Sequence, residues 1–299
     1  MKKTEQSIYT FKVIAQSFGL LKCREIMSAW VGEKVSRIAS NQSDLKKTIE
    51  LIRKLNLYYH VNTNLIFTKR DIGKGGWSNK FDDRHNPSLD KGEYLIYIAN
   101  SKKDLKIALK ADLDNNEKDF GEGLGIPECC INFYLSNKEK AFSKQNDYVT
   151  LVASNTRGLH SFNYWNNYVS QYFGYSFLSF FPCSFTCKEA VKQSKRSYEM
   201  MFSLLPEEAE KILYFQKQPI LYTEYRGIYL FEGAISNNTQ TLIDNCIIHS
   251  TMKSTSKTLK FIQNTKEIKI LDKSKIHFTS KKDKTRVVDN KDWVMCSFI

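Results

Sequence analysis

Two cysteine pairs constrain the fold of this chain more than any other feature of its sequence. The first, called the vicinal pair here, is Cys129-Cys130 in LGIPECCINFY, and the second, the spaced pair, is Cys183 and Cys187 in FPCSFTCKEA. A proline precedes each pair, and each lies where a helix is predicted to start. We therefore interpret the vicinal pair as half of one site, completed by the spaced pair.

The predicted position of the cysteines favours chemistry at the thiolate. Unpaired N–H groups and the dipole at a helix N-terminus attract negative charge, so we expect lowered thiol pKa values at both pairs. The thiolate is the form that binds a metal or acts as a nucleophile. Four such ligands can supply an all-cysteine zinc site or a [4Fe–4S] cluster.

The spacing within each pair bears on the kind of site. Adjacent residues of a regular helix point about 100° apart, so the vicinal pair can reach one metal only if its turn is irregular. Structural zinc sites usually have two C-x2–4-C motifs, so the missing spacer argues against simple structural zinc. The spaced pair lies on one helical face, or around a turn if Pro182 starts the helix. Metal or cluster binding, thiol redox chemistry and inert burial all remain open.

The two motifs, with SYEMMFSLLPEE after the second, resemble a prokaryotic family of domains of unknown function, number 483. Members of that family carry similar G-[YI]-P-x-C-C and P-C-x3-C motifs, and the resemblance covers roughly residues 92–235. It implies that Pro127, Pro182 and the four cysteines belong to one framework, and it implies no activity. A looser similarity exists to cluster-binding redox proteins with a Cys-Cys pair, which have a glycine after that pair that this chain lacks.

Hydrophobic periodicity predicts an α+β fold in two parts. Residues 1–60 are predicted to be helical, and residues 92–100 to form a strand that leads into a serine-capped helix. Helices are also predicted after each cysteine pair and from Pro206. From Gln218 onward, short β-prone runs alternate with lysine-rich turns, and a hairpin is predicted at Arg226-Gly227. We predict a mainly helical domain with a short strand element over residues 1–217 and a small, basic, β-rich region over residues 218–299.

Several side chains near the cysteines are candidates for the site. Glu122 and Glu128 could act as an acid, a base or an oxygen ligand, although glutamates are common at helix starts for electrostatic reasons. His160 falls between the two pairs and could be a ligand or transfer protons, although a histidine among aromatic residues is commonly a core residue. Arg157 could hold a carboxylate or phosphate.

A simpler explanation is available for the polar group in the long loop and for the isolated cysteines. A long loop is predicted over residues 69–90, and it contains a short group formed by Asp82, Asp83 and His85. The group could bind a hard metal ion, but charged side chains exposed to solvent on a loop are the simpler explanation. The isolated cysteines Cys23, Cys246 and Cys296 are predicted to be structural.

Composition limits the classes of function. The chain has 299 residues, 41% of them hydrophobic, and no apolar run approaches the roughly 20 residues that cross a bilayer. Seven cysteines in this length do not form a dense disulfide scaffold, so we expect a cytoplasmic protein with no membrane partner. The net charge of +13 makes a nucleic-acid partner possible, but lysines spread along the chain do not favour one. Hydrolase and dinucleotide-binding motifs are absent.

The leading hypothesis from the sequence is a cysteine-ligated metalloprotein, and specifically an iron–sulfur enzyme. A [4Fe–4S] cluster on the four cysteines, with His160, Glu128 and Arg157 nearby, would act as an oxidoreductase or lyase on a small-molecule or peptide substrate. One alternative is a zinc-stabilised binding module that uses its basic C-terminal region on nucleic acid or an acidic partner. Another is a metal-free thiol-redox enzyme that cycles the vicinal pair against the spaced pair.

Overall fold

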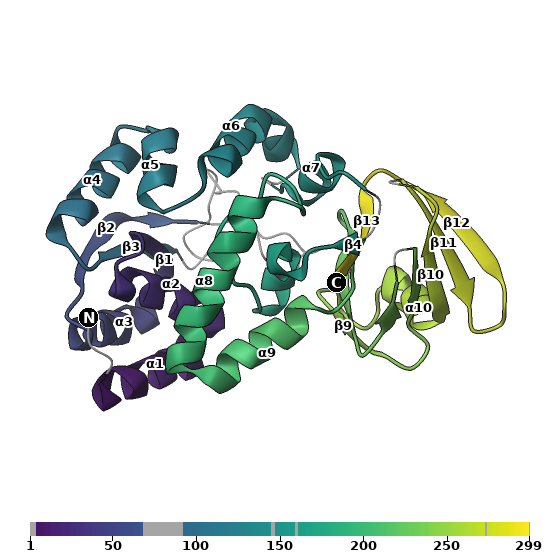
Figure 1. Cartoon of the computed structure of the whole chain (residues 1–299), viewed down its shortest axis with the longest axis horizontal. Helices are drawn as coiled ribbons and strands as arrows, with labels where there is room; N and C mark the ends of the chain where they lie inside the picture. Colours follow the sequence, from purple (N-terminus) through teal and green to yellow (C-terminus); the bar gives the residue numbers. More distant parts are fainter. Residues whose placement is uncertain are drawn as a thin grey trace. The chain divides into compact units, whose positions relative to one another are not determined.

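The structure, a computed structural model, describes residues 4–67, 92–144, 147–158, 161–237, 239–272 and 274–298. A mainly helical body is followed along the chain by a strand-rich C-terminal region, which confirms the predicted α+β class (Figure 1). No helix in these ranges is long and apolar enough to cross a membrane.

The described residues form two compact units. The first holds residues 4–67, residues 92–138 and the segment Lys195–Glu210, and the second holds the described residues of 139–194 and 211–298. The predicted boundary near residue 217 stays a prediction.

The first unit contains a small antiparallel sheet in the order β1-β3-β2. The elements before the vicinal pair are α1 (Glu5–Phe18), α2 (Leu20–Val31), β1 (Ser36–Asn41), α3 (Gln42–Lys54), β2 (Tyr58–Ile66), β3 (Glu93–Ala99), α4 (Lys102–Leu113) and α5 (Glu117–Gly123). The predicted strand at residues 92–100 and the capped helix after it are confirmed as β3 and α4. The Ser101 hydroxyl caps α4 by accepting a hydrogen bond from the Asp104 N–H at 3.0 Å.

The prediction of helix throughout residues 1–60 is wrong at β1 and at the start of β2. The inward positions of β1 include Ser36 and Ser40, which are both buried. Ser36 donates to the Glu25 carbonyl at 2.6 Å, and the Ser40 hydroxyl lies 3.4 Å from that of Thr48. Because hydroxyls that bond to neighbouring helices occupy these positions, β1 lacks the apolar alternation that marks a strand.

The helices predicted after each cysteine pair and from Pro206 are confirmed as α6 (Glu128–Ser143), α8 (Lys188–Leu204) and α9 (Pro206–Gln216), whereas α7 (Val149–Ser154) was not predicted. The 3-10 segments η2 (Tyr164–Asn166) and η3 (Val169–Phe173) come before α8. Pro206 is the first residue of α9, as predicted.

Two five-stranded sheets, ordered β12-β11-β10-β8-β7 and β4-β13-β5-β6-β9, lie in the second unit. Their strands are β4 (Ser161–Phe162), β5 (Ile220–Thr223), β6 (Gly227–Glu232), β7 (Ile235–Ser236), β8 (Gln240–Leu242), β9 (Ile247–Ser250), β10 (Thr265–Ile270), β11 (Lys275–Ser280), β12 (Thr285–Asp289) and β13 (Trp293–Phe298). The hairpin predicted at Arg226-Gly227 is confirmed, because β5 and β6 pair antiparallel on either side of it.

A helix, α10 (Lys257–Gln263), occupies a segment for which strands and turns were predicted. The Ser256 hydroxyl caps it by accepting a hydrogen bond from the Leu259 N–H at 3.4 Å. Leu259 and Ile262 are its buried residues. Because lysines separate so few apolar residues, the sequence shows no clear helical periodicity, and a helix was not predicted here.

Strand β13 connects the C-terminal residues to the segment between the two cysteine pairs. Every residue of β13 is buried, and the strand pairs antiparallel with β5. Its last two residues pair in parallel with Ser161 and Phe162 of β4. This sheet therefore takes strands from both sides of residue 217.

Candidate metal centre

The vicinal pair lies in the first turn of α6. The Pro127 carbonyl accepts hydrogen bonds from the N–H groups of both Cys130, at 2.8 Å, and Ile131, at 3.0 Å. The helix thus begins at Glu128, and one carbonyl at its start accepts both a 3-10-type bond, from Cys130, and a regular α-type bond, from Ile131. The sulfur atoms of the two adjacent cysteines lie 3.8 Å apart in this turn.

The spaced pair lies in the loop that leads into α8. The Cys187 carbonyl accepts from the N–H of Val191 at 3.1 Å, and the Cys187 N–H donates to the Ser184 carbonyl at 3.2 Å. Cys187 therefore immediately precedes the helix, which begins at Lys188 and not at Pro182. The pair thus lies around a turn before the helix, and the prediction that Pro182 would start the helix in that arrangement is wrong.

Two asparagine side chains hold this loop by its carbonyl groups. Asn166 is fully buried, and its Nδ2 donates to the carbonyls of Phe185 at 3.0 Å and Cys187 at 3.1 Å. Asn155 donates to the carbonyl of Cys183 at 2.7 Å. The backbone at both cysteines is thus fixed by neighbouring side chains, as a preorganised site requires.

Phe185, between the two cysteines, anchors the loop in an aromatic core. It is fully buried, and its N–H donates to the Thr156 hydroxyl at 2.9 Å. Its ring stacks on Phe162 with centroids 4.7 Å apart, and lies 5.8 Å from the rings of Tyr168 and Phe298. Aromatic pairs of this kind contribute about 1 kcal/mol each beyond the burial of their area.

These supporting residues were not among the candidates predicted from the sequence. The signal for them is the run SFNYWNNYVSQYF between the two pairs, where asparagines alternate with aromatic residues. Buried asparagines in such a run are candidates for holding backbone groups.

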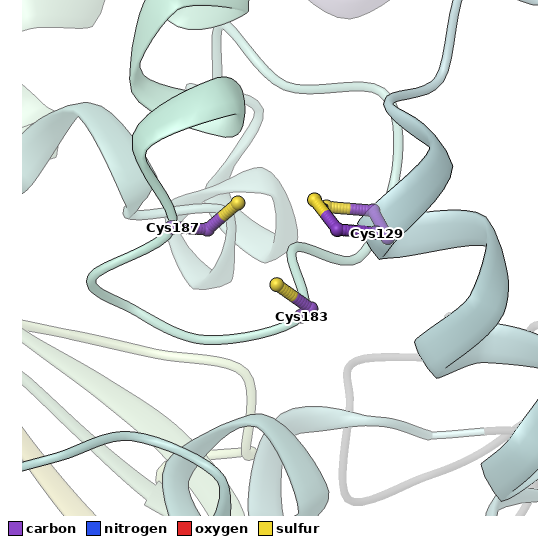
Figure 2. Close-up of side chains that lie close together, drawn as sticks. Cys129, Cys183 and Cys187 are labelled. Atoms are coloured by element: carbon purple, nitrogen blue, oxygen red, sulfur yellow. The ribbon is translucent and has the colours of Figure 1, made fainter.

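The two cysteine pairs meet in the structure. The sulfur atoms of the four cysteines all lie within 4.8 Å of one another, and Figure 2 shows those of Cys129, Cys183 and Cys187 turned toward one another. Cys130 and Cys187 are buried, Cys183 is half-buried and Cys129 is exposed. Among the described residues no cysteine is in a disulfide. Four thiol donors this close together could hold a metal ion.

Residues 102–218, which include both cysteine pairs, match the model of a family described as a protein of unknown function, DUF483. The matched segment covers about two fifths of the chain. The match confirms the resemblance inferred from the motifs, over a shorter stretch than expected. The DUF483 segment contains the four cysteines and both asparagines that hold the spaced pair, whereas Phe298 lies outside it. No curated protein and no solved structure matches the chain.

The other predicted site residues are not among the four donors that the structure brings together in its described part. Glu128 is the exposed first residue of α6, and it is not part of the donor group formed by the described residues. Arg157 is exposed and directly follows Thr156. The roles of these two residues stay predictions. His160 lies outside the described residues, as does the group in the long loop at residues 82–85.

Burial keeps the remaining three cysteines protonated. Burial raises the pKa of Cys23 to about 12, with a smaller contribution from Glu208, and raises that of Cys246 to about 11. Burial also raises the pKa of Cys296 far above its usual value. Since the thiolate is the metal-binding form, these three positions are poor ligands.

Proposed function

We propose that the four cysteines bind a single metal ion, zinc, in a tetrahedral sulfur site that stabilises the fold. The observation that carries this proposal is the closeness of the four sulfur atoms. With Zn–S bonds of about 2.3 Å, tetrahedral geometry puts neighbouring sulfurs about 3.8 Å apart. The sulfurs of the vicinal pair are 3.8 Å apart, and all four lie within 4.8 Å of one another.

A [4Fe–4S] cluster, the leading hypothesis from the sequence, fits these distances less well. Each cysteine of such a cluster binds a different iron, with the inorganic core between the cysteine sulfurs. The sulfurs then stand farther apart than they do around one ion. The missing spacer in the vicinal pair argued against zinc, but the two sulfurs lie 3.8 Å apart, a distance that suits two ligands of one zinc ion.

A complete set of four thiolates favours a structural role over a catalytic one. Catalytic zinc keeps a coordination position for water or substrate, whereas structural zinc has four protein ligands. The hydrogen bonds at the carbonyls of Cys183 and Cys187 support a site of fixed geometry. The ion would hold the first turn of α6 to the loop before α8, and its binding energy would contribute to folding.

Metal content and cobalt spectroscopy test the proposal on the full chain, purified without oxygen. We expect colourless protein with about one zinc per chain, and cobalt(II) in place of zinc should give the visible absorption of a tetrahedral thiolate site. Cys183→Ser should lose the zinc and the cobalt spectrum. Cys246→Ser is the matched control, because Cys246 is also half-buried but lies outside the cluster, and it should keep both.

Three results would overturn the proposal. Brown protein that contains iron and sulfide, and loses its colour in Cys183→Ser, would support the cluster. Metal-free protein whose four thiols cycle reversibly through disulfides would support the thiol-redox alternative. Equal loss of zinc in Cys183→Ser and Cys246→Ser would show that the metal is held elsewhere.

A further inference from the structure

We propose that a basic surface on α10 and the β11–β12 hairpin binds nucleic acid through its phosphate backbone. Residues 253–286 hold eleven lysines and arginines against three acidic residues, so this short segment carries +8 of the chain's net charge of +13. The positive charge is therefore concentrated in one part of the second unit, whereas the sequence analysis described it as spread along the chain. Such a patch is the electrostatic signature of a polyanion-binding surface.

The fold gathers this charge at the C-terminal end of α10. The N–H of Lys281, in the hairpin, donates to the carbonyl of Asn264 at 2.9 Å, and Asn264 is the residue that ends α10. Lys260 lies one turn earlier on the helix, and its carbonyl accepts from the Asn264 side chain at 2.8 Å. The tip of the hairpin therefore lies beside the last turn of the helix.

Arg286 brings a further charge from β12 to the same place. Its backbone pairs with that of Phe278 on β11, and its guanidinium lies 5.2 Å from the ring centroid of Phe261 on α10. The rings of Phe261 and Phe278 are 5.1 Å apart. Packing against an aromatic ring fixes the planar guanidinium while the residue stays exposed, which suits it to contact a phosphate.

Four exposed residues, called the basic cluster here, carry charge that is not neutralised locally: Lys260, Lys282, Lys284 and Arg286. In the described part of the chain, no carboxylate forms an ion pair with any of the four. Lys266 and Lys281 beside them are paired, with Asp283 and with Asp244 respectively. Unpaired surface cations can replace the counterions of a phosphate backbone, and the release of those counterions drives binding.

The chemistry of the surface favours contacts to phosphate over contacts to bases. Base recognition in single strands uses exposed aromatic rings as stacking platforms. The ring of Phe278 is buried in the core, and that of Phe261 lies against Arg286. We therefore expect binding that depends on salt and hardly on sequence. This inference is independent of the metal centre.

Fluorescence anisotropy of the full chain with labelled probes tests the proposal. Suitable probes are a single-stranded RNA and a duplex DNA, each of about 20 nucleotides per strand, measured between about 50 and 200 mM salt. Replacing all four residues of the basic cluster by Gln should weaken binding at least tenfold. It should also lower the slope of log K against log salt by about 3, since each phosphate contact contributes about 0.7 to 0.9.

A charge-matched control separates this surface from net charge. The control variant replaces four exposed lysines of the first unit by Gln: Lys102, Lys103, Lys106 and Lys118. It removes the same charge and should keep the wild-type affinity within about twofold, because these residues lie outside the proposed surface. A double variant, Lys282→Gln with Lys284→Gln, keeps the packing of Arg286 on Phe261 and should lower the slope by about half as much, with unchanged melting temperature.

Absence of binding to both probes at low salt would overturn the proposal. It would also be overturned if the control variant lost as much affinity as the cluster variant, or if the chain bound anionic lipid vesicles and neither probe. Point variants are needed because deleting the C-terminal region would also remove β13 from the sheet that supports the spaced pair.

Discussion

At the scale of single residues, a buried carboxylate between two cations stands out in the first unit. Glu25 accepts from Arg24 at 2.5 Å and from Lys34 at 2.9 Å, and all three side chains are largely buried. Burial would raise the pKa of Glu25, but the charges of Lys34 and Arg24 outweigh it and lower the pKa to about 2. Lys34 also packs beneath the turn before α6, where a Cβ at Gly125 would lie 3.1 Å from the Cβ of Lys34. Through Lys34, the Glu25 carboxylate thus helps to hold the turn at Gly125, which precedes the vicinal pair.

Glu25→Gln should destabilise the protein by about 3 kcal/mol at neutral pH, because it removes a negative charge that lies between two buried cations. The folded-state pKa lies below the ordinary value of 4.5, so the carboxylate stabilises the fold above about pH 4.5. That stabilisation is lost as the pH falls toward 2. Urea unfolding across this range should show a smaller pH dependence in the variant than in the wild type.

Glu50→Gln is the control for this prediction. Glu50 forms an exposed pair with Lys54 at 2.9 Å, so its loss should hardly change stability. An acid dependence in Glu25→Gln as steep as that of the wild type would contradict the assignment of the low pKa to Glu25.

At the scale of elements, the loop before α8 is held mainly by side chains distant in sequence. Asn166 fixes two of its carbonyls, and Phe298 packs against Phe185 from β13. The start of α6 beside Pro127 could be predicted, because the signals that begin a helix act locally, whereas Pro182 does not begin α8. The contacts of Asn166 and Phe298 with this loop could not be predicted, because they depend on which segments distant in the sequence come together. Likewise β1 has serines at inward positions and α10 few apolar residues, so neither shows a clear period.

Asn166→Ala should lower zinc affinity by about 10- to 100-fold, the usual effect of losing a group that positions metal ligands. The carbonyls of Phe185 and Cys187 would lose the hydrogen bonds from Asn166, so the loop that carries the spaced pair would be held less firmly. Competition with a chromophoric chelator measures the affinity. Asn163→Ala is the control, because the exposed Asn163 only caps η2 through the N–H of Trp165 at 3.0 Å.

If Asn166→Ala fails to fold, Asn155→Ala provides a milder form of the same test. Asn155 is exposed and donates to the Cys183 carbonyl alone, so its loss should weaken zinc binding by a smaller factor. Unchanged zinc affinity in both variants would show that these hydrogen bonds do not position the ligands.

At the scale of the whole molecule, β13 makes residues 293–298 part of the support for the loop that carries the spaced pair. The ring of Phe298 lies 6.2 Å from that of Phe162 and 5.8 Å from that of Phe185, and Phe298 itself is buried. The β-rich region is therefore joined to the segment between the cysteine pairs through a shared sheet. The sequence predicted the strands of this region but could not show that the last of them pairs with β4.

Phe298→Ala should lower the free energy of unfolding by about 3 to 5 kcal/mol, as expected for truncating a buried aromatic side chain. It should also speed the loss of zinc to a chelator, since the loop between Cys183 and Cys187 loses part of its packing. Thermal melting and the rate of zinc release measure the two effects. Phe202→Ala, at an exposed position on α8, should leave the release rate near that of the wild type. Similar release rates in the two variants would contradict the link from β13 to the metal centre.

The parallel pairing of β13 with β4 has a consequence for biosynthesis. Residues 293–298 leave the ribosome long after both cysteine pairs. At 5–20 residues per second, translation from Cys187 to Phe298 takes roughly ten seconds. During that time Phe185 and Phe162 lack the ring of Phe298, and the cysteines lack the finished loop that orders them. If the four cysteines bind zinc as proposed, an ion bound at this stage should be released faster than from the finished chain.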